Sequence, residues 1–473
     1  MVAHTAIPAR FYRHRNPELS PFFRLVDSHF DEFERSYADR YEKQYGFWRP
    51  IIRSSIDKYM KCGDLKEGFA RIKCKECGHE MFVAFSCRQR CCCPSCHQKR
   101  TLLLAHHLGE DVFAEVPHRQ FVFTIPKRLR IYFRYDRTLL SSLIHAAWET
   151  VRDVFLEEVD YEEGFPAMVA GVQTFGDLIN FHPHIHAIVP CGIFMESGKF
   201  IAVNQIPAER FQAVWEDNVF AFLLKAERIS PAVVENMKGW NHSGFSVDNS
   251  VYVAADDTSG MQRLIEYIAR CPFSLARIIK ISDTGKVIYR AGKSGCRAFP
   301  EQGNDSLKAG VKRNFEVFEP LDFLAEVTQH IPNKGEHQVR YYGWYSNKQR
   351  GVRSKKAEVG EMPQSSIIKK KCSPGWAALI KMVYDVDPLQ CPDCGGEMKV
   401  VAFIERYQMD VVEQILRHCN LWTVKIARPP PEFVEKVRSY VPDEAFVPRA
   451  QPKVPKSEAR PDIDYAFFDN LCG

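Results

Sequence analysis

Three histidines occupy alternate positions in one short segment of the chain. Residues 181–189 read Phe-His-Pro-His-Ile-His-Ala-Ile-Val, which includes His182, His184 and His186. Alternate side chains of a strand share a face, so His184 and His186 should point the same way. Two imidazoles on one strand can bind a divalent metal and leave positions open for a phosphate oxygen. The alternative is a histidine pair on a polar strand face.

A tyrosine on a predicted helix is the candidate nucleophile. The segment 261–271, MQRLIEYIARC, follows Thr258 and Ser259 and precedes Pro272, which is typical of a helix with a capped start and a blocked end. Tyr267 lies on the flank of the apolar stripe, where its phenol could act near a metal. The simpler interpretation is a half-buried packing residue.

The cysteines are concentrated near the N-terminus. Of the 16 cysteines, eight lie in residues 62–96. Two CxxC pairs separated by fifteen residues match the spacing of a closed, four-thiolate structural zinc site. The predicted zinc ligands are Cys74, Cys77, Cys93 and Cys96, and further potential ligands in the same segment are Cys87, Cys91, Cys92 and His79. Basic residues around the cluster suit phosphate contacts, and these are Arg71, Lys73, Lys75, Arg88, Arg90, Lys99 and Arg100.

A further CxxC pair, Cys391 and Cys394, lies near the other end of the chain. One pair supplies two thiolates, and a zinc site needs four ligands. His418 and Cys419, on the predicted helix 408–419, are candidates to complete a second zinc site.

The segment 340–371 combines aromatic and basic residues, with nine Lys/Arg and two acids. Interleaved rings and cations suit single-stranded DNA, whose bases stack while its phosphates are neutralised. The predicted DNA-binding residues are Arg340, Tyr341, Tyr342, Trp344, Tyr345, Lys348 and Arg350. The alternative is a solvated loop with a small aromatic core. Tyr341, Tyr342 and Tyr345 are also rival nucleophiles.

Strands and helices alternate irregularly between these motifs. Apolar runs predict strands at 120–125, 168–176 and 184–194, and helical periodicity appears at 141–159, 211–229 and 261–271. This mixture predicts an α+β fold. The expected domains are a helical lead-in (1–60), a cysteine-rich zinc-binding, DNA-binding domain (61–110), a catalytic domain (115–300), a basic aromatic segment (301–375), a small CxxC module (376–428) and a Pro-rich tail (429–473).

The bulk composition sets few limits on function. The 473 residues carry 64 Lys+Arg and 59 Asp+Glu, a net charge of +5, which permits a polyanionic partner without requiring one. We find no run of about eighteen apolar residues and no secretory signal, so the expected compartment is the cytoplasm and no membrane contact is expected. Clustered cysteines in a reducing compartment favour metal binding over disulfides.

Seven segments carry a family resemblance in one order along residues 60–405. They are CGDLKEGFARIKCKECG, FSCRQRCCCPSC, HRQFVFTIPKRLR, NFHPHIHAIVPCG, EYIARCPFSLARI, HIPNKGEHQVRYYGWYSNKQRG and DPLQCPDCGGEMKVVAFIE. In these segments the chain resembles rolling-circle insertion-sequence transposases of the HUH (His-hydrophobe-His) superfamily, of the insertion sequence ninety-one and common-region type.

The resemblance implies an HUH endonuclease domain, with a central antiparallel sheet flanked by helices, preceded by a small zinc-binding domain. It implies that His184 and His186 bind Mg²⁺ or Mn²⁺ and that Tyr267 forms a covalent 5′-phosphotyrosine with DNA. His182 is the candidate third ligand and Asp177 a weaker one. The implied function is a transposase that nicks and rejoins single-stranded DNA at element ends. The alternatives are a replication-initiator or relaxase-like nickase, and a zinc-dependent DNA-binding protein with an inactive nuclease site.

The chain departs from the two-tyrosine members of this family. The position four residues after Tyr267 holds Cys271 instead of a second tyrosine, so the chain resembles the single-tyrosine branch. Either Tyr267 acts twice, two subunits cooperate as a homodimer, or an activated water or hydroxyl performs the second step.

Overall fold

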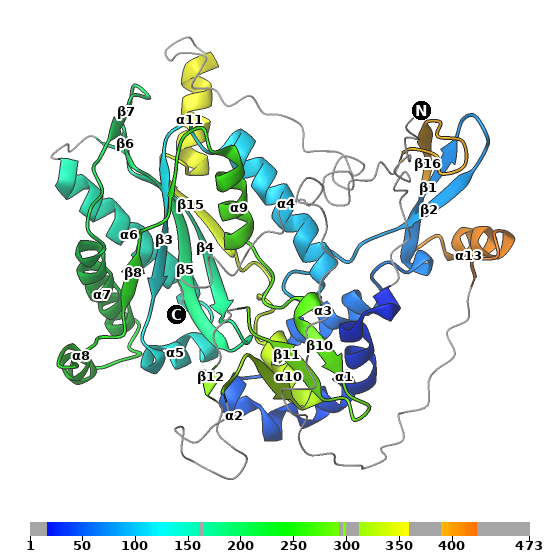
Figure 1. Cartoon of the computed structure of the whole chain (residues 1–473), viewed down its shortest axis with the longest axis horizontal. Coiled ribbons are helices and arrows are strands. Elements are labelled where there is room, and N and C mark those ends of the chain that lie inside the picture. Colours follow the sequence, from blue (N-terminus) through cyan, green and yellow to red (C-terminus); the bar gives the residue numbers. More distant parts are fainter. Residues whose placement is uncertain (1–16, 160–163, 293–296, 299–311, 359–388, 423–473) are drawn as a thin grey trace, which may run out of the picture.

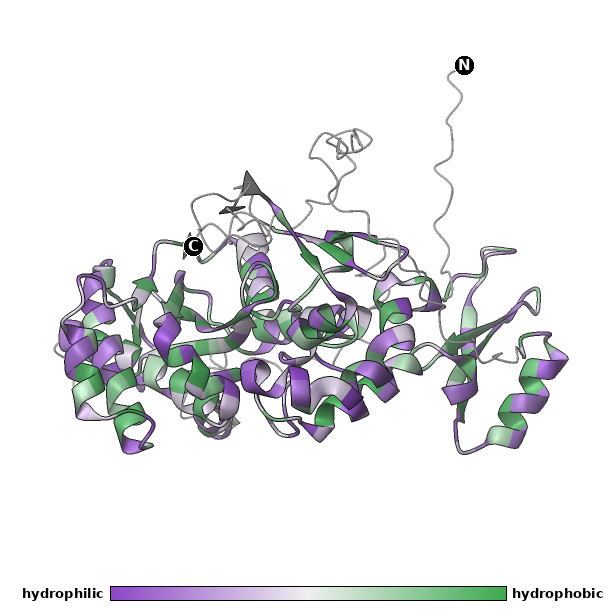
Figure 2. Ribbon diagram, turned by 90° about the horizontal axis from the view of Figure 1, so that it is seen from below, coloured by the Kyte–Doolittle hydropathy of each residue, from purple (hydrophilic) through white to green (hydrophobic). Residues whose placement is uncertain are grey.

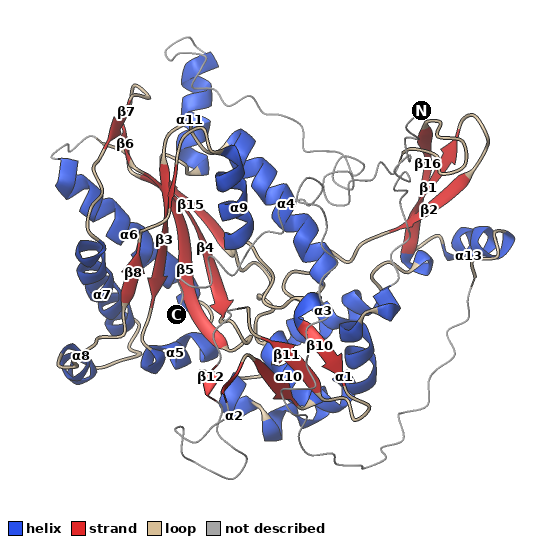
Figure 3. Ribbon diagram, in the orientation of Figure 1, coloured by secondary structure: helices blue, strands red, loops and turns tan. Residues whose placement is uncertain are grey.

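The computed structural model describes residues 17–159, 164–292, 297–298, 312–358 and 389–422 (Figure 1). The predicted Pro-rich tail and residues 359–388 of the basic segment and CxxC module lie outside the described residues. The described chain forms a large central sheet with its helices, a helical body beside it and a small three-stranded body at one end (Figure 3).

The central sheet contains six strands, and every pairing in it is antiparallel. Its order is β15-β4-β5-β3-β8, and β9 also pairs with β3. The strands are β3 (His118–Thr124), β4 (Ala167–Phe175), β5 (Phe181–Pro190), β8 (Ser246–Asp248), β9 (Tyr252–Val253) and β15 (Val339–Gly343). The predicted α+β fold with a central antiparallel sheet is therefore confirmed, and the predicted segments 120–125, 168–176 and 184–194 fall largely on β3, β4 and β5.

Helices cover both faces of this sheet. The largest core lies between the sheet and the helices α5 (Arg130–Tyr135), α6 (Leu139–Val159), α7 (Ala208–Lys225) and α8 (Pro231–Lys238). A second core lies on the opposite face, under α4 (Pro94–Asp111) and α9 (Thr258–Ile268). Seen from below in Figure 2, the helices carry both hydrophobic (green) and hydrophilic (purple) residues. All nine residues of β4 are buried, so a side chain on that strand is buried whichever way it points.

The N-terminal helices belong to a body whose elements fall in three of the domains expected from the sequence. The helices α1 (Pro21–Arg40), α2 (Glu42–Tyr45), α3 (Pro50–Met60) and α10 (Pro320–Thr328) pack with the sheet β10 (Ile278–Ile281), β11 (Val287–Arg290) and β14 (Phe315–Phe318). The described residues of 21–60, 273–291 and 318–331 thus share one core. The predicted helical lead-in is therefore not a separate unit.

The small body at one end joins two distant parts of the chain. Its sheet has the order β16-β1-β2, from β1 (Gly68–Cys74), β2 (Glu80–Ala84) and β16 (Met398–Glu405), and α13 (Met409–His418) packs beside it (Figure 1). The predicted CxxC module at 376–428 is therefore not independent, because its strand completes the sheet of the cysteine-rich domain.

The other elements are peripheral to these bodies. They are the hairpin β6 (Gly192–Phe194) and β7 (Phe200–Ala202), the pair β12 (Arg297–Ala298) and β13 (Lys312–Arg313), and the helix α11 (Asn347–Glu358).

Candidate active site

Two histidines of β5 face the α4 and α9 side of the sheet. His184 and His186 are 2% and 0% exposed, and their ring centroids lie 4.8 Å apart. The neighbouring residues Ile185 and Ala187 belong to the core on the opposite face. The alternation predicted from the sequence places both imidazoles together in a region that excludes water.

The Nδ1 atom of each imidazole has a hydrogen-bond partner. His184 Nδ1–H donates to the carbonyl oxygen of His182 over 2.7 Å, which leaves Nε2 with its lone pair. His186 Nδ1 lies 3.0 Å from the side-chain amide of Gln120. Gln120 Oε1 has no hydrogen-bond partner among the described residues. With the Gln120 side-chain amide rotated by a half-turn, Oε1 takes the place of Nε2 and accepts a hydrogen bond from His186 Nδ1–H. Metal-bound histidines donate their second ring N–H to an acceptor in this way.

The Nε2 atoms of His184 and His186 are buried and have no hydrogen-bond partner in the described part of the chain. Burial lowers the pKa of His184 to about 4 and also lowers the pKa of His186, with the charge of Arg270 acting in the same direction on both. Both rings are therefore neutral at pH 7. Neutral imidazoles with available Nε2 atoms fit a divalent metal ion.

A third metal ligand is not brought to this pair. In the described residues, the groups of at least three His, Cys, Asp or Glu ligand atoms within 4.8 Å of one another are cysteine groups. The His182 ring centroid is 5.0 Å from that of His184, so His182 stays a prediction. Asp177 is engaged elsewhere, because its Oδ1 accepts hydrogen bonds from Arg277 and from the Gly292 amide.

Tyr267 lies against the histidine strand. Its ring contacts that of His186 in an edge-to-face arrangement, with centroids 4.9 Å apart and planes at 85°. The Arg270 guanidinium carbon lies 4.4 Å from the Tyr267 ring centroid. The chain thus brings together a strand and a helix about eighty residues apart, and the predicted nucleophile and predicted metal ligands share one site.

Two residues of β4 hold the end of α9 in place. Gln173 Nε2 donates to the carbonyls of Tyr267 and Ile268, over 2.7 and 3.1 Å. Gly171, which pairs with His186, gives the helix room to approach, because a Cβ at Gly171 would lie 2.4 Å from Ile268 Cγ2. Neither residue was singled out in the sequence, although a glycine within a strand is a known signal of close backbone approach.

Tyr267 is more buried than the sequence predicts. Its side chain is 0% exposed instead of half-buried. The helical periodicity of the sequence predicts a single packed face for α9. In the structure, α9 is enclosed by the sheet on one side and by Ala105 and Leu108 of α4 on the other. DNA therefore reaches this hydroxyl only if the covering residues move.

Cys271 does not continue the tyrosine helix. The helix α9 ends at Ile268 with Ala269 as its C-cap, so Cys271 lies beyond it and not on the predicted helical face. Cys271 packs against the core of the helical body, and burial raises the pKa of its thiol.

The aromatic residues predicted to bind DNA are largely structural. Trp344 stacks on Phe194 with centroids 5.0 Å apart, and the Tyr345 hydroxyl lies 2.8 Å from His118 Nε2. Both are buried, at 7% and 1% exposed. Because the segment after β15 folds into the core, Trp344 and Tyr345 would reach DNA only if this segment moved, and their contact with DNA stays a prediction.

The other residues of this set differ in exposure. Tyr341 and Tyr342 are half-buried on β15, and the Tyr342 ring stacks on Trp148. Lys348 is exposed on α11, whereas Arg350 donates to the Asp111 carbonyl. Arg340 is also partly buried, so Lys348 is the most accessible of the seven.

The cysteines form two groups, each with four sulfur atoms within 4.8 Å of one another. The members of one group are Cys62, Cys87, Cys93 and Cys96, and those of the other are Cys74, Cys77, Cys391 and Cys394. The predicted grouping of Cys74 and Cys77 with Cys93 and Cys96 is therefore wrong. Strand β16 brings Cys391 and Cys394 to the first CxxC pair, and His418 and Cys419 do not complete either group.

Several basic residues of the cysteine-rich segment already have partners. Arg71 and Lys73 form ion pairs with Glu80, and Lys75 pairs with Glu397. Arg88 and Arg100 are exposed and remain candidates for phosphate contacts.

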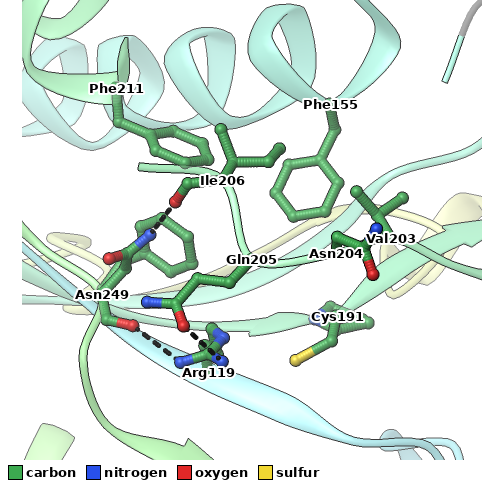
Figure 4. A pocket seen from close by; sticks show the side chains of 11 residues that line it. Arg119, Phe155, Cys191, Val203, Asn204, Gln205, Ile206, Phe211 and Asn249 are labelled. Carbon is green, nitrogen blue, oxygen red and sulfur yellow. Dashed lines mark hydrogen bonds between the residues drawn. The ribbon is translucent and has the colours of Figure 1, made fainter. Parts of the chain in front are cut away.

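A small cavity on the α6 and α7 face of the sheet is unrelated to this site (Figure 4). It has a volume of about 20 Å³, and Arg119, Phe155, Cys191 and Phe211 are among its lining residues. That volume holds about one water molecule, so it cannot accept a nucleotide.

Comparison with known proteins identifies the family. Residues 167–352 match the family described as "Putative transposase", and residues 32–125 match that described as "Transposase zinc-binding domain" of the IS91 type. Together these ranges cover more than half of the chain. The chain belongs to the IS91-type transposases.

Two curated relatives agree with this assignment. The transposase for insertion sequence element IS801 of Pseudomonas savastanoi pv. phaseolicola is 23% identical over 380 residues, covering 76% of this chain and 85% of the relative. "Putative transposase y4qJ" of Sinorhizobium fredii is 24% identical over 339 residues, covering 67% of this chain and 80% of the relative. No solved structure matches this transposase significantly. Among the described residues, no helix is long and apolar enough to cross a membrane.

Proposed function

We propose that this transposase nicks and rejoins single-stranded DNA at element ends through a covalent tyrosine intermediate, as an HUH endonuclease. The observation that carries the proposal is the ring contact between Tyr267 and His186, with centroids 4.9 Å apart. A phenol beside two neutral, buried imidazoles is the arrangement expected for nucleophilic attack at a metal-bound phosphodiester.

In the cleavage step, the Tyr267 oxygen attacks the phosphorus and loses its proton to solvent. The bond between phosphorus and the 3′ oxygen breaks, and that oxygen takes up a proton. The products are a 5′-phosphotyrosine and a free 3′-hydroxyl. Attack by an acceptor 3′-hydroxyl reverses these changes and restores Tyr267. Since the phosphotyrosine conserves the phosphodiester bond energy, rejoining needs no nucleotide cofactor. This chemistry is compatible with rolling-circle transposition.

The residues His184 and His186 would hold the catalytic Mg²⁺ or Mn²⁺ through their Nε2 atoms, with His182 as the candidate third ligand. The metal would polarise the phosphate and stabilise the leaving oxygen. Gln120 fixes the orientation of His186, and Gln173 fixes that of the helix carrying Tyr267. Arg270, close to both the tyrosine and the histidines, adds positive charge where the phosphate would lie.

The zinc of the zinc-binding domain is assigned to Cys62, Cys87, Cys93 and Cys96. Sulfur–sulfur distances in this group are 3.6, 3.6 and 3.8 Å. Four sulfurs at about 2.3 Å from a tetrahedral zinc lie roughly 3.8 Å from one another. The group therefore has the dimensions of a closed structural site.

The position of Cys271 affects how the second strand would be cut. Because Cys271 lies beyond α9, no residue replaces a second tyrosine on this helix. A second cleavage would use Tyr267 again, the Tyr267 of a second copy in a homodimer, or an activated water.

The test is cleavage of a labelled single strand carrying the element end, with Mn²⁺. Wild type should form a covalent protein–DNA adduct and Tyr267→Phe should form none, although the phenylalanine preserves the ring contact. Tyr341→Phe and Tyr342→Phe are matched controls and should keep the adduct. An adduct that persists in Tyr267→Phe would move the nucleophile to another tyrosine.

The assignment of His184 and His186 as metal ligands is tested by a measurement separate from DNA cleavage. His184→Ala and His186→Ala should abolish Mn²⁺ binding, measured by electron paramagnetic resonance of the free ion, as well as adduct formation. His145→Ala, on the exposed side of α6, should change neither. Retained Mn²⁺ binding in both β5 variants would exclude this site as the metal site.

A further inference from the structure

The second cysteine group joins two segments that lie more than 300 residues apart in the sequence. Cys74 and Cys77 lie at the turn between β1 and β2, whereas Cys391 and Cys394 precede β16. The Sγ atoms of Cys74 and Cys394 are 3.5 Å apart, as are those of Cys77 and Cys391. These pairs are 320 and 314 residues apart in the sequence.

The four sulfur atoms have the dimensions of a metal site. All lie within 4.8 Å of one another, and the edges of a four-thiolate zinc tetrahedron are roughly 3.8 Å. In the first group, sulfurs at similar distances lie in a domain whose family binds zinc. Cys74 and Cys77 lie inside residues 32–125, which match that family, whereas Cys391 and Cys394 lie outside them. The likeness therefore does not assign this four-cysteine site.

The two CxxC turns have the same local geometry. Each is followed by a glycine in the left-handed region, Gly78 with φ of 78° and Gly395 with φ of 76°. The Cys74 amide donates to the His79 carbonyl, and the Cys391 amide donates to the Gly396 carbonyl. This is the form of a zinc knuckle, in which a tight turn directs both thiolates of a CxxC pair to one ion.

Other contacts hold the two turns face to face. His79 Nδ1 lies 2.7 Å from an Asp393 carboxylate oxygen, and Lys75 Nζ lies 2.6 Å from Glu397. Strand β16 pairs with β1 along its full length, from Gly68 to Cys74. The apolar core beneath is small, with Ile72, Met81 and Met398 among its members. A domain with so small an apolar core usually needs an additional cross-link, such as a bound metal ion, to be stable.

We propose that Cys74, Cys77, Cys391 and Cys394 bind a second structural Zn²⁺. The ion fastens a C-terminal strand to the N-terminal hairpin, so the zinc-binding domain is built from two segments with the catalytic sheet inserted between them. A four-thiolate site leaves no open position, so this ion is structural.

The first experiment measures zinc per chain in the full-length protein by mass spectrometry of the metal. Wild type should contain two zinc ions, and the double variant Cys391→Ser/Cys394→Ser should contain one. Cys419→Ser, which alters a cysteine outside both groups, should keep two. One ion in wild type, or two ions in the double variant, would overturn the proposal.

The second experiment needs no variant and so does not depend on a variant's folding. Cys77 and Cys394 are exposed, so as free thiols they would react rapidly with iodoacetamide. In the zinc-loaded protein both should resist alkylation until a chelator is added, as followed by peptide mass spectrometry. Rapid alkylation without chelator would refute the site. Neither readout depends on Tyr267 or on DNA cleavage, so this proposal and the proposed function can fail separately.

Discussion

His97 and Thr101 connect the first cysteine group to the candidate nucleophile. The Cys91 amide donates to His97 Nδ1, so Nε2–H is the donor to the Ala269 carbonyl over 2.7 Å. Thr101 Oγ1 lies 2.8 Å from the same carbonyl. Ala269 follows Tyr267 by two residues, and His97 directly follows Cys96, a proposed zinc ligand. The position of the phenol therefore depends on side chains next to the first cysteine group.

Replacement of His97 tests this connection. We expect His97→Ala to slow adduct formation by about 100-fold, because a displacement of about 1 Å in a reacting group has an effect of that size. Zinc content and Mn²⁺ binding should not change. His97→Gln, whose amide can still donate to the Ala269 carbonyl, should recover much of the rate. Loss of zinc in His97→Ala would show instead that the side chain supports the metal site.

Residue types and spacing predicted part of this site. The alternation of His184 and His186 and the helix carrying Tyr267 follow from local periodicity. The partners of these residues do not, because Gln120, Gln173 and His97 reach the site through contacts between distant segments. The same limit applies to the cysteines, since spacing alone pairs Cys74 with its near neighbours and gives no sign of the β1–β16 pairing.

At the scale of elements, α9 is held between a strand and a helix. Gly171 of β4 allows the close approach on one side, and α4 packs on the other. This double packing explains why the sequence underestimates the burial of Tyr267. The strand β15 could not be predicted either, because its aromatic and basic residues resemble an open binding loop, whereas its backbone forms the edge of the central sheet.

Substitution of Gly171 should shift α9. A Cβ there would lie 2.4 Å from Ile268 Cγ2, so Gly171→Ala must push the helix away from β5. We expect adduct formation to fall at least tenfold and the stability to fall by about 1–3 kcal/mol, as in overpacked cores. Gly109→Ala is the control, because a Cβ in that exposed part of α4 meets nothing within 4 Å. Equal rates in the two variants would contradict the role assigned to Gly171.

At the scale of the whole molecule, a buried ion pair joins the region of the central sheet to the helical body. Arg137 donates to both carboxylate oxygens of Glu336, over 3.0 and 2.7 Å, and also to the Gln329 carbonyl. Their side chains are 5% and 13% exposed. Burial raises the pKa of Glu336, but the hydrogen bonds and charge of Arg137 outweigh this effect and leave that pKa below its ordinary value.

A lowered carboxyl pKa fixes the direction of the pH dependence. Glu336 stabilises the fold above its unfolded pKa of about 4.3, and this contribution is lost as the pH falls through the folded pKa. Arg137→Met leaves a buried carboxylate without its partner and should cost about 3–5 kcal/mol at pH 7. Arg53→Met, which removes surface ion pairs with Asp31, Glu34 and Asp57, should cost only about 1 kcal/mol. Urea unfolding at pH 7 and pH 4 measures both, and equal losses would contradict the assignment.

The pairing of β16 with β1 also determines when the three-stranded sheet can be completed during synthesis of the chain. The hairpin β1–β2 leaves the ribosome more than three hundred residues before its third strand exists. At about 5–20 residues per second, the partner strand arrives tens of seconds later. A copy of the gene interrupted anywhere before residue 391 therefore encodes no complete cysteine-rich domain. Broken copies of such an element would therefore not release a finished cysteine-rich domain on its own.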